Sequence, residues 1–285
     1  MPGYITHSVR LLAVPLLLAG VAGGVAPGAA SAAKAGIAGT AVPFRISGNL
    51  YGVAATSASS AWAVGYGGSL TSPKPLIVHW NGTSWKQAPN PAPAGTTLAG
   101  VAATSATNAW AVGSTSTGKA LIERWNGTAW AQVPAPHPGS FSSLSGVAAV
   151  SASSAWAVGC TTCATPSGFN GPLIEGWDGK AWAQTPSPGL GAPGGILAGV
   201  AALSATSAWA VGGTVNGVGA SAAIATLIAQ WNGVKWTRVP SPTPGGRAAL
   251  SAVAAVSATS AWAVGNVGAG KTLIERWNGT AWKVS

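Results

Sequence analysis

One nine-residue phrase, Ser-Ala-Ser-Ser-Ala-Trp-Ala-Val-Gly at residues 57–65, recurs along the chain and constrains its fold more than any other feature. It returns almost unchanged at residues 105–113, 151–159, 204–212 and 257–265. Tandem repetition at this interval is typical of solenoids and propellers, in which each repeat buries its apolar face against the next. The chain is therefore expected to be an array of five similar units.

Each phrase lies within a longer unit, which continues with Leu-Ile-x-x-Trp, then Asn-Gly or Asp-Gly, and then a last Trp. Three Trp in each of the five units account for all 15 Trp of the chain. The units begin at Leu50, Leu98, Leu144, Leu197 and Leu250. Because every Trp has equivalents in the other units, most are expected to serve packing.

Each unit has the pattern of four short β-strands, which we letter a to d. In the second unit, residues 98–103, 109–113, 121–125 and 129–133 are apolar runs bounded by turn-forming residues. Trp110 and Val112 share one face of strand b, and Ala lines the other, because alternate strand residues point the same way. The bulky face of one sheet is thus expected to pack on the shallow face of the next.

The turn between strands c and d is Asn-Gly in four units and Asp178-Gly179 in the third. These pairs favour a type I′ turn, which needs positive φ at both central residues. Groups of four antiparallel strands at this interval predict β-propeller blades. We therefore predict an all-β fold, a five-bladed β-propeller of four-stranded antiparallel blades. It spans residues 49–285, with blades at 50–97, 98–143, 144–196, 197–249 and 250–285.

The fifth unit carries a family resemblance. Its residues 253–265 and 273–282 resemble a kelch-type blade of the central domain of galactose-oxidase-like proteins, although only Gly212-Gly213 keeps the family's Gly pair after strand b. The resemblance covers residues 50–285 and implies the fold, but little about activity, because propellers host both enzymes and interaction modules. Galactose-oxidase-type enzymes bind copper through Tyr and His. No such set can be carried over, so no cofactor and no metal is expected.

The five blades are further expected to close into one ring. The first and last units keep the residues that face neighbours inside the array, namely Trp62 and Val64 in the first and Trp262 and Val264 in the last. Open repeat arrays usually carry polar caps instead. The lead segment, residues 33–48, is interpreted either as a strand that helps to close the ring or as a linker, and both interpretations stay open.

Residues 1–32 have the features of a secretory signal peptide. Arg10 precedes an apolar stretch at residues 11–25, and Ala30-Ser31-Ala32 fits a small-residue cleavage site. An uncleaved membrane anchor is the alternative, since about 20 apolar residues can span a bilayer, but Pro and Gly within the stretch weaken that alternative. We expect a secreted, extracellular monomer that meets a membrane only if this segment is not cleaved.

The connections between strands b and c vary most, and they occupy residues 66–75, 114–120, 160–172, 213–226 and 266–272. In an alternating blade these connections and the links between blades emerge on one face, which we call the b–c loop face. Binding residues on rigid scaffolds usually lie in such loops. The candidate ligand-binding residues are the scattered polar and aromatic residues of this face, Tyr66, Lys74, His137, Phe141, Phe169, Asn170 and Asn216.

Cys160 and Cys163 are the only 2 Cys of the chain and lie in the third b–c loop. Their spacing also occurs in redox motifs and zinc half-sites, but zinc usually takes four ligands. Because secretion favours disulfides, we predict a local disulfide between them.

Three of the four acidic residues, Glu123, Glu175 and Glu275, occupy one equivalent position in strand c of different blades. They stand on different blades around the rim, too far apart for the paired carboxylates of glycoside hydrolysis. The pairs Glu123-Arg124 and Glu275-Arg276 are predicted to lie on a solvated outer strand. The expected function is a non-catalytic module that binds an extracellular protein or glycan through the b–c loop face. The alternative is an extracellular carbohydrate-active enzyme with its site at the central channel.

The net charge of +10 arises from 14 Lys and Arg against 4 Asp and Glu. The basic residues are scattered, with no run or stripe, which argues against nucleic-acid binding. A weak attraction to anionic wall polymers is compatible with this excess.

Overall fold

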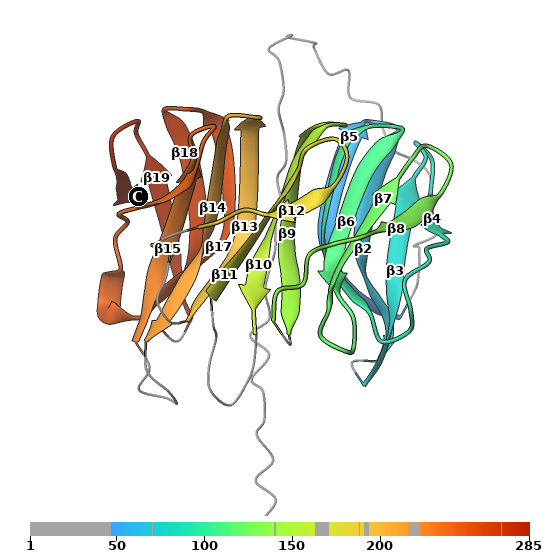
Figure 1. Cartoon of the computed structure of the whole chain (residues 1–285), viewed down its shortest axis with the longest axis horizontal. Helices are drawn as coiled ribbons and strands as arrows, with labels where there is room; N and C mark the ends of the chain where they lie inside the picture. Colours follow the sequence, from blue (N-terminus) through green and yellow to red (C-terminus); the bar gives the residue numbers. More distant parts are fainter. Residues whose placement is uncertain are drawn as a thin grey trace, which may run out of the picture.

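The computed structural model describes residues 47–285, except residues 70, 140, 163–170, 188, 191–193, 217–222 and 269. The described residues form 20 β-strands in five antiparallel sheets of four strands (Figure 1). The strands of each sheet follow one another in chain order, so each sheet is one blade. An all-β arrangement of four-stranded propeller blades is thus confirmed. The expected signal peptide and the lead segment up to residue 46 lie outside the described residues.

Blade 1 consists of β1 (Gly48–Ser57), β2 (Ser60–Ser69), β3 (Ser72–Trp80) and β4 (Trp85–Ala88). Blade 2 consists of β5 (Thr97–Ser105), β6 (Asn108–Ser114), β7 (Ala120–Trp125) and β8 (Trp130–Val133). Blade 3 consists of β9 (Ser142–Ser151), β10 (Ser154–Thr161), β11 (Gly171–Trp177) and β12 (Trp182–Gln184). Blade 4 consists of β13 (Gly195–Ser204), β14 (Ser207–Asn216), β15 (Ala223–Trp231) and β16 (Trp236–Val239).

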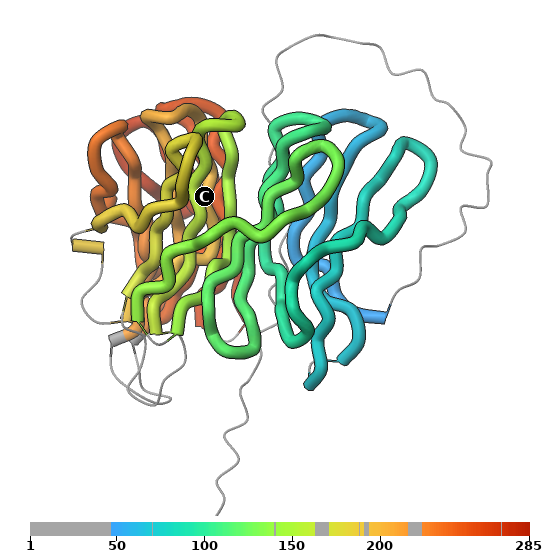
Figure 2. The backbone as a smooth tube through the Cα atoms, turned by 45° about the vertical axis from the view of Figure 1, so that its right-hand side comes forward, coloured from blue at the N-terminus to red at the C-terminus, as the bar shows by residue number. Residues whose placement is uncertain are grey.

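Blade 5 consists of β17 (Ala248–Ser257), β18 (Ser260–Val267), β19 (Lys271–Trp277) and β20 (Trp282–Val284). A short 3-10 helix, η2 (Pro244–Gly246), precedes it. Within the described ranges, no helix has the length and apolar character needed to cross a membrane. Figure 2 follows the chain from the first blade, in blue, to the last, in red. The first strands of consecutive blades pack on one another in series, β1 on β5, β5 on β9, β9 on β13 and β13 on β17.

The turn between strands c and d differs from the predicted type I′ turn. Trp125 pairs with Trp130, so four residues, 126–129, lie between the paired Trp. Asn126 does not have positive φ, since Thr162 is the only non-glycine residue with positive φ in the described part of the chain. Instead, Asn126 Oδ1 accepts hydrogen bonds from the backbone N–H of Thr128 and of Ala129, each at 2.9 Å. The residue is therefore Asn or Asp because its side chain caps the turn as an acceptor.

Consecutive blades meet at apolar joints, which we name by the two blades that they connect. In joint 1–2 the bulky face of blade 1 supplies Trp62, Val64 and Ile77. These meet the shallower face of blade 2, which supplies Leu98, Val101, Ala109, Ala111, Leu121 and Trp130. The same pattern recurs at joints 2–3, 3–4 and 4–5. The predicted packing of a bulky face on a shallow face is confirmed.

Pairs of Trp hold each joint together. Trp62 of blade 1 makes an edge-on contact with Trp130 of blade 2, with ring centroids 5.1 Å apart and an interplanar angle of 89°. The corresponding pairs at the other joints have centroids 5.1 to 5.2 Å apart. Edge-to-face pairs of this kind contribute about 0.5–1.5 kcal/mol beyond the area that they bury. The repeated Trp therefore serve packing between blades.

Glycine lets the innermost strands approach closely. A Cβ placed on any of four equivalent glycines would lie only 3.0 to 3.3 Å from the backbone of the next blade. These glycines are Gly52, Gly100, Gly146 and Gly199. A side chain there would push the inner edges of the two blades apart. The last blade has Ala252 at the corresponding position.

The five blades do not close into a ring, so the predicted closed five-bladed propeller is wrong. Trp262 of blade 5 is 38% exposed, whereas its internal equivalents are at most 7% exposed. At the other end, Leu50 is 49% exposed, whereas Leu98, Leu144, Leu197 and Leu250 are at most 2% exposed. The angle between blades follows from the side chains that fill each joint. At this angle, five blades do not bring the two ends together.

Candidate functional site

The b–c hairpins and the connections between blades lie side by side, which confirms that they share one face. Gly95, in the link from blade 1 to blade 2, donates its backbone N–H to Pro73 O at 2.8 Å. Ser142, at the start of β9, donates to Gly118 O in the b–c hairpin of blade 2, also at 2.8 Å. The hairpins of blades 1 and 2 are thus tied to the chain that enters the next blade.

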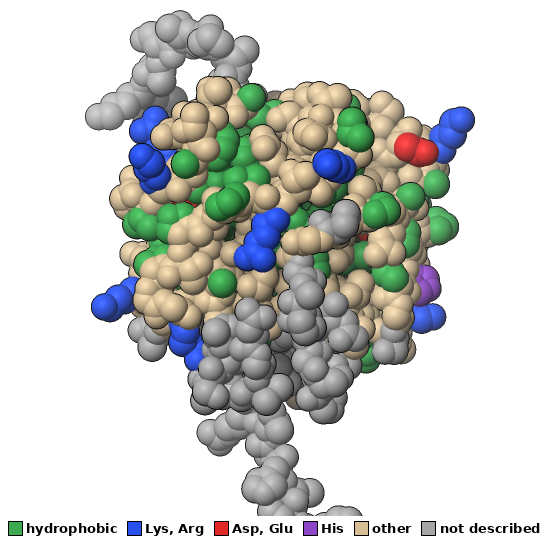
Figure 3. Space-filling view, turned by 60° about the vertical axis from the view of Figure 1, so that its left-hand side comes forward, with side chains coloured by type: hydrophobic (Ala, Val, Ile, Leu, Met, Phe, Trp, Pro, Cys, Tyr) green, Lys and Arg blue, Asp and Glu red, His purple; other side chains and the backbone are tan. Residues whose placement is uncertain are grey.

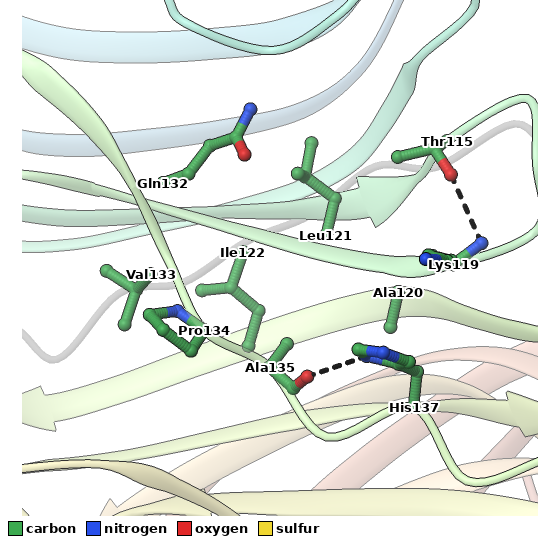
Figure 4. Close-up of a pocket in the computed structure, with 10 residues that line it drawn as sticks. All are labelled: Thr115, Lys119, Ala120, Leu121, Ile122, Gln132, Val133, Pro134, Ala135 and His137. Carbon is green, nitrogen blue, oxygen red and sulfur yellow. Dashed lines mark hydrogen bonds between the residues drawn. The ribbon is translucent and has the colours of Figure 1, made fainter.

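A cavity of about 340 Å³ opens on this face beside blade 2 (Figure 4). Its apolar part comes from strands β7 and β8 and the link that follows β8. Its polar part comes from the b–c hairpin, β8 and the same link. The lining residues are Thr115, Lys119, Ala120, Leu121, Ile122, Gln132, Val133, Pro134, Ala135 and His137.

The apolar floor is rigid and the polar rim is accessible. Leu121 is 6% exposed and Ile122 is fully buried, since both belong to the core of the blade. Lys119, Gln132 and His137 are exposed at the rim. The backbone N–H of Lys119 donates to Thr115 Oγ1 at 3.2 Å, which orders the hairpin that carries the lysine. An apolar floor with a few accessible polar groups is the usual composition of a small-ligand site.

His137 forms a hydrogen bond within the link that connects blade 2 to blade 3. Its Nδ1 lies 2.9 Å from Ala135 O. Because a carbonyl oxygen can only accept, we assign the proton to Nδ1 in this contact. With the proton on Nδ1, Nε2 is the ring nitrogen that can accept a hydrogen bond from a ligand hydroxyl. His137, predicted from the sequence, therefore lies in the cavity.

Phe141 stands next to this cavity on the same face. It is 42% exposed. A Cβ added to Gly118, at the tip of the b–c hairpin of blade 2, would lie 2.3 Å from its ring. The ring therefore lies directly on the glycine, whose φ of 74° also disfavours other residues. Phe141 offers an accessible aromatic surface immediately before β9, the strand that follows the link.

Two other predicted residues lie in strands, because the first b–c hairpin is longer and more regular than expected. Tyr66 belongs to β2 and is 3% exposed, and its hydroxyl accepts a hydrogen bond from Asn49 Nδ2 at 2.6 Å. Lys74 is exposed on β3, where it pairs with Gly67 of β2. Neither residue lines the cavity beside blade 2.

The remaining predicted residues are only partly described. Asn216 is the last residue of β14, and Phe169, Asn170 and Cys163 lie outside the described residues. Cys160 is 5% exposed in β10, and the described residues include no free cysteine. The Cys160–Cys163 disulfide stays a prediction. Within the described ranges, no group of three or more His, Cys, Asp and Glu could hold a metal ion.

The three glutamates are not on a solvated outer strand, and that prediction is wrong. Glu123, Glu175 and Glu275 are fully buried. Each lies between a Leu and a Trp that face a joint, as Glu123 does between Leu121 and Trp125 in joint 1–2. Glu175 and Glu275 occupy the same place in joints 2–3 and 4–5. Among the described residues, their carboxyl oxygens have no hydrogen-bond partner.

Burial raises the pKa of all three carboxyls, because the charged form loses its hydration. The pKa of Glu175 rises to about 8, and that of Glu275 to about 7. The pKa of Glu123 also rises to about 7, although the backbone N–H of Ala92 lies near enough to offset part of the effect. The equivalent residues of blades 1 and 4 are Val78 and Ala229, both buried. This position therefore belongs to the core of each joint.

The buried glutamates also bear on catalysis. Each lies in a different joint, closed off from solvent. A pair of accessible carboxyls on either side of a bound sugar is what glycoside hydrolysis requires. These three residues do not form such a pair.

Comparisons with known proteins give a fold but no family. No protein family model matches the chain, and no curated protein matches it. Among solved structures, the fucose-specific lectin from Aleuria aurantia, a six-bladed β-propeller, is 14% identical with a TM-score of 0.53. The match covers 84% of this chain and 79% of the lectin.

A second solved structure of similar likeness is the GH74 xyloglucanase from Xanthomonas campestris, 14% identical with a TM-score of 0.54. That match covers 82% of this chain but only 38% of the xyloglucanase. At such low identity these likenesses show the fold alone, and they do not confirm the kelch-type resemblance. The chain therefore has the β-propeller architecture, with five four-stranded blades in an arc that does not close.

Proposed function

We propose that this protein is a non-catalytic binding module that holds a glycan at the cavity beside blade 2. The observation that carries the proposal is the composition of that cavity, with a rigid apolar floor and a rim of Lys119, Gln132 and His137 on the b–c loop face. A sugar presents hydroxyls along its edges and C–H groups on its faces. Such a cavity offers a partner for both kinds of surface.

The individual contacts follow from the chemistry of the rim. The Lys119 ammonium donates hydrogen bonds, the Gln132 amide donates and accepts, and His137 Nε2 accepts. The faces of the sugar ring pack on Val133 and Pro134, accessible apolar residues of the lining, and on the neighbouring Phe141. The fucose-specific lectin lends support, because it is a propeller of similar architecture whose ligand is a sugar.

We expect the double variant Lys119→Ala with His137→Ala to bind glycan roughly ten- to a hundredfold more weakly, since each lost hydrogen bond contributes about 1 kcal/mol. Binding is measured on immobilised fucosyl conjugates, xyloglucan and acidic polysaccharides. Titration with the best of these ligands then gives the affinity.

Lys271→Ala is the matched control for this experiment. Lys271 precedes Thr-Leu-Ile-Glu-Arg-Trp in β19 as Lys119 precedes Ala-Leu-Ile-Glu-Arg-Trp in blade 2. It is exposed in the same way but does not line the cavity. Equal loss of binding in the control would indicate general charge attraction and contradict the proposed site. Hydrolysis of the bound polysaccharide would instead support the carbohydrate-active enzyme.

Secretion is part of the same proposal. Cleavage after Ala32 leaves a mature chain that begins at Ala33 and acts outside the cell. Mass spectrometry of protein from the culture medium is expected to find this N-terminus. A protein that keeps residues 1–32 and fractionates with membranes would contradict cleavage and support the anchor.

A further inference from the structure

The two ends of the blade array expose apolar surfaces that internal blades bury. On blade 5 the exposed surface consists of Trp262, Val264 and Ile274, at 38%, 43% and 43% exposure, and we call it the trailing face. On blade 1 it consists of Leu50 and Val53 in β1, at 49% and 46% exposure, and we call it the leading face. Figure 3 shows hydrophobic side chains gathered among polar ones on the side turned forward from the left of Figure 1, where blade 5 lies.

The exposed residues of the two faces correspond to residues that face each other across a joint inside the chain. In joint 4–5, Trp209, Val211 and Ile228 of blade 4 pack on Leu250 and Val253 of blade 5. The residues of the trailing face are the equivalents of the first three, and those of the leading face are the equivalents of the last two. The same halves already pack together at four joints within the chain. The surface that fits the trailing face is therefore the leading face of another molecule.

We propose that the trailing face of one copy of this protein binds the leading face of a second copy. This contact is heterologous, so its repetition gives a ring of copies or an open fibre. Only the inner part of the leading face is open to a partner, because Ala63, Leu76 and Val78, farther out on the same face of blade 1, are buried. The expected contact is thus smaller than an internal joint and reversible.

Ala252 is expected to weaken this contact. At the internal joints the inner strand has glycine where it faces the next blade, as in Gly199, which would place a Cβ 3.0 Å from Ala252 Cα. Blade 5, which carries the trailing face, has Ala252 at this position. In the geometry of the internal joints, the Ala252 methyl would press on Gly52 of the second copy. We therefore expect Ala252→Gly to strengthen association severalfold.

The test uses two variants of the full chain, each with one face blocked. Ile274→Arg places a charge on the trailing face, and Leu50→Arg places one on the leading face. Both residues are exposed, so both variants are expected to fold, which circular dichroism and thermal unfolding check. Each variant alone is expected to sediment as a monomer, whereas the wild type associates in the micromolar range.

Mixing the two variants decides the orientation of the contact. The mixture retains one intact trailing face and one intact leading face, so it is expected to form a 1:1 dimer and nothing larger. Wild-type protein that stays monomeric would overturn the proposal and indicate that the leading face is covered within the molecule. Association of Leu50→Arg alone would also overturn it, because trailing faces would then bind each other.

Discussion

Replacing Trp209 with Ala is expected to lower the free energy of unfolding by about 3–5 kcal/mol, the usual cost of truncating a fully buried Trp. Trp209 is 0% exposed in β14, and its ring lies 5.0 and 5.2 Å from those of Trp277 and Trp282 in blade 5. The two sheets that form joint 4–5 are held by backbone hydrogen bonds, so they cannot collapse into the cavity left behind. Chemical denaturation gives the difference.

Trp262→Ala is the matched control, because Trp262 occupies the same position in the last blade. Its ring is 38% exposed, with Arg276 5.2 Å from its centroid, and none of the five described blades packs on it as blade 5 packs on Trp209. We expect a loss of about 1 kcal/mol or less, as for a substitution outside the core. The measurement is made at low protein concentration, where copies are separate. Equal losses at both positions would contradict the open arc.

The blades could be predicted from the sequence because the signals for them are local. Alternation of Trp110 and Val112 with Ala defines the two faces of strand b within a few residues, and the same pattern occurs in every unit. The position of the c–d turn was also predictable, but its type was not. Asn-Gly is compatible with a type I′ turn and with a turn capped by the Asn side chain. The longer connection between Trp125 and Trp130 selects the capped turn.

Ring closure could not be predicted from the same residues. The first and last units carry the apolar faces of internal units, a pattern that favours ends that meet. The angle between blades depends on how Trp and Leu side chains fill each joint, which composition does not reveal. One signal in the sequence does distinguish the last unit, the Ala252 that replaces the glycine of the other four.

The candidate site was predictable only in part. His137 was identified as a lone polar residue in a connection between blades, and the structure places it in the cavity. Leu121 and Ile122, which form the floor, look like ordinary core residues in the sequence. Tyr66 and Lys74 fall within the variable b–c connection predicted at residues 66–75, whereas in the structure they continue the β2–β3 hairpin.

The buried glutamates were missed although a signal for them exists. The pair Glu123-Arg124 resembles a solvated strand when read as two adjacent charges. Alternate residues of a strand point to the same side, so Glu123 shares a face with Leu121 and Trp125. The equivalent positions of blades 1 and 4 hold the apolar residues Val78 and Ala229, which also indicates that this face is buried.

The stability of the protein is expected to fall as the pH rises above neutrality. The pKa values of Glu123 and Glu275 are raised to about 7 and that of Glu175 to about 8 by burial. A raised pKa in the folded state means that the folded protein holds protons that the unfolded chain releases. The contribution of each carboxyl is fully present below the pKa of the unfolded chain and is lost as the pH rises through the folded value.

The comparison is best made between pH 6.5 and pH 9. Burial lowers the pKa of His79, so protonation of its imidazole at acid pH lowers the stability of the folded protein. This change with pH is opposite in direction to that of the glutamates. Tyr51 has a raised pKa and titrates above this range. Since one pKa unit corresponds to about 1.4 kcal/mol, the three carboxyls together are expected to remove roughly 3 kcal/mol of stability across this range.

Blade 4 shows which residue can replace a buried glutamate. Blade 4 carries Ala229 where blades 2, 3 and 5 carry a glutamate, and joint 3–4 packs with Leu227 and Ala229 in its core. Substituting all three glutamates with Ala is therefore expected to preserve the fold and to flatten the dependence of the unfolding free energy on pH. Glu175→Ala alone should remove the largest single share, because its pKa is raised the most. The free energy of unfolding of the wild-type protein could instead stay constant or increase from pH 6.5 to pH 9. That result would show that the carboxyls ionise at no cost in the joints. It would contradict the buried, unpartnered positions of the three glutamates.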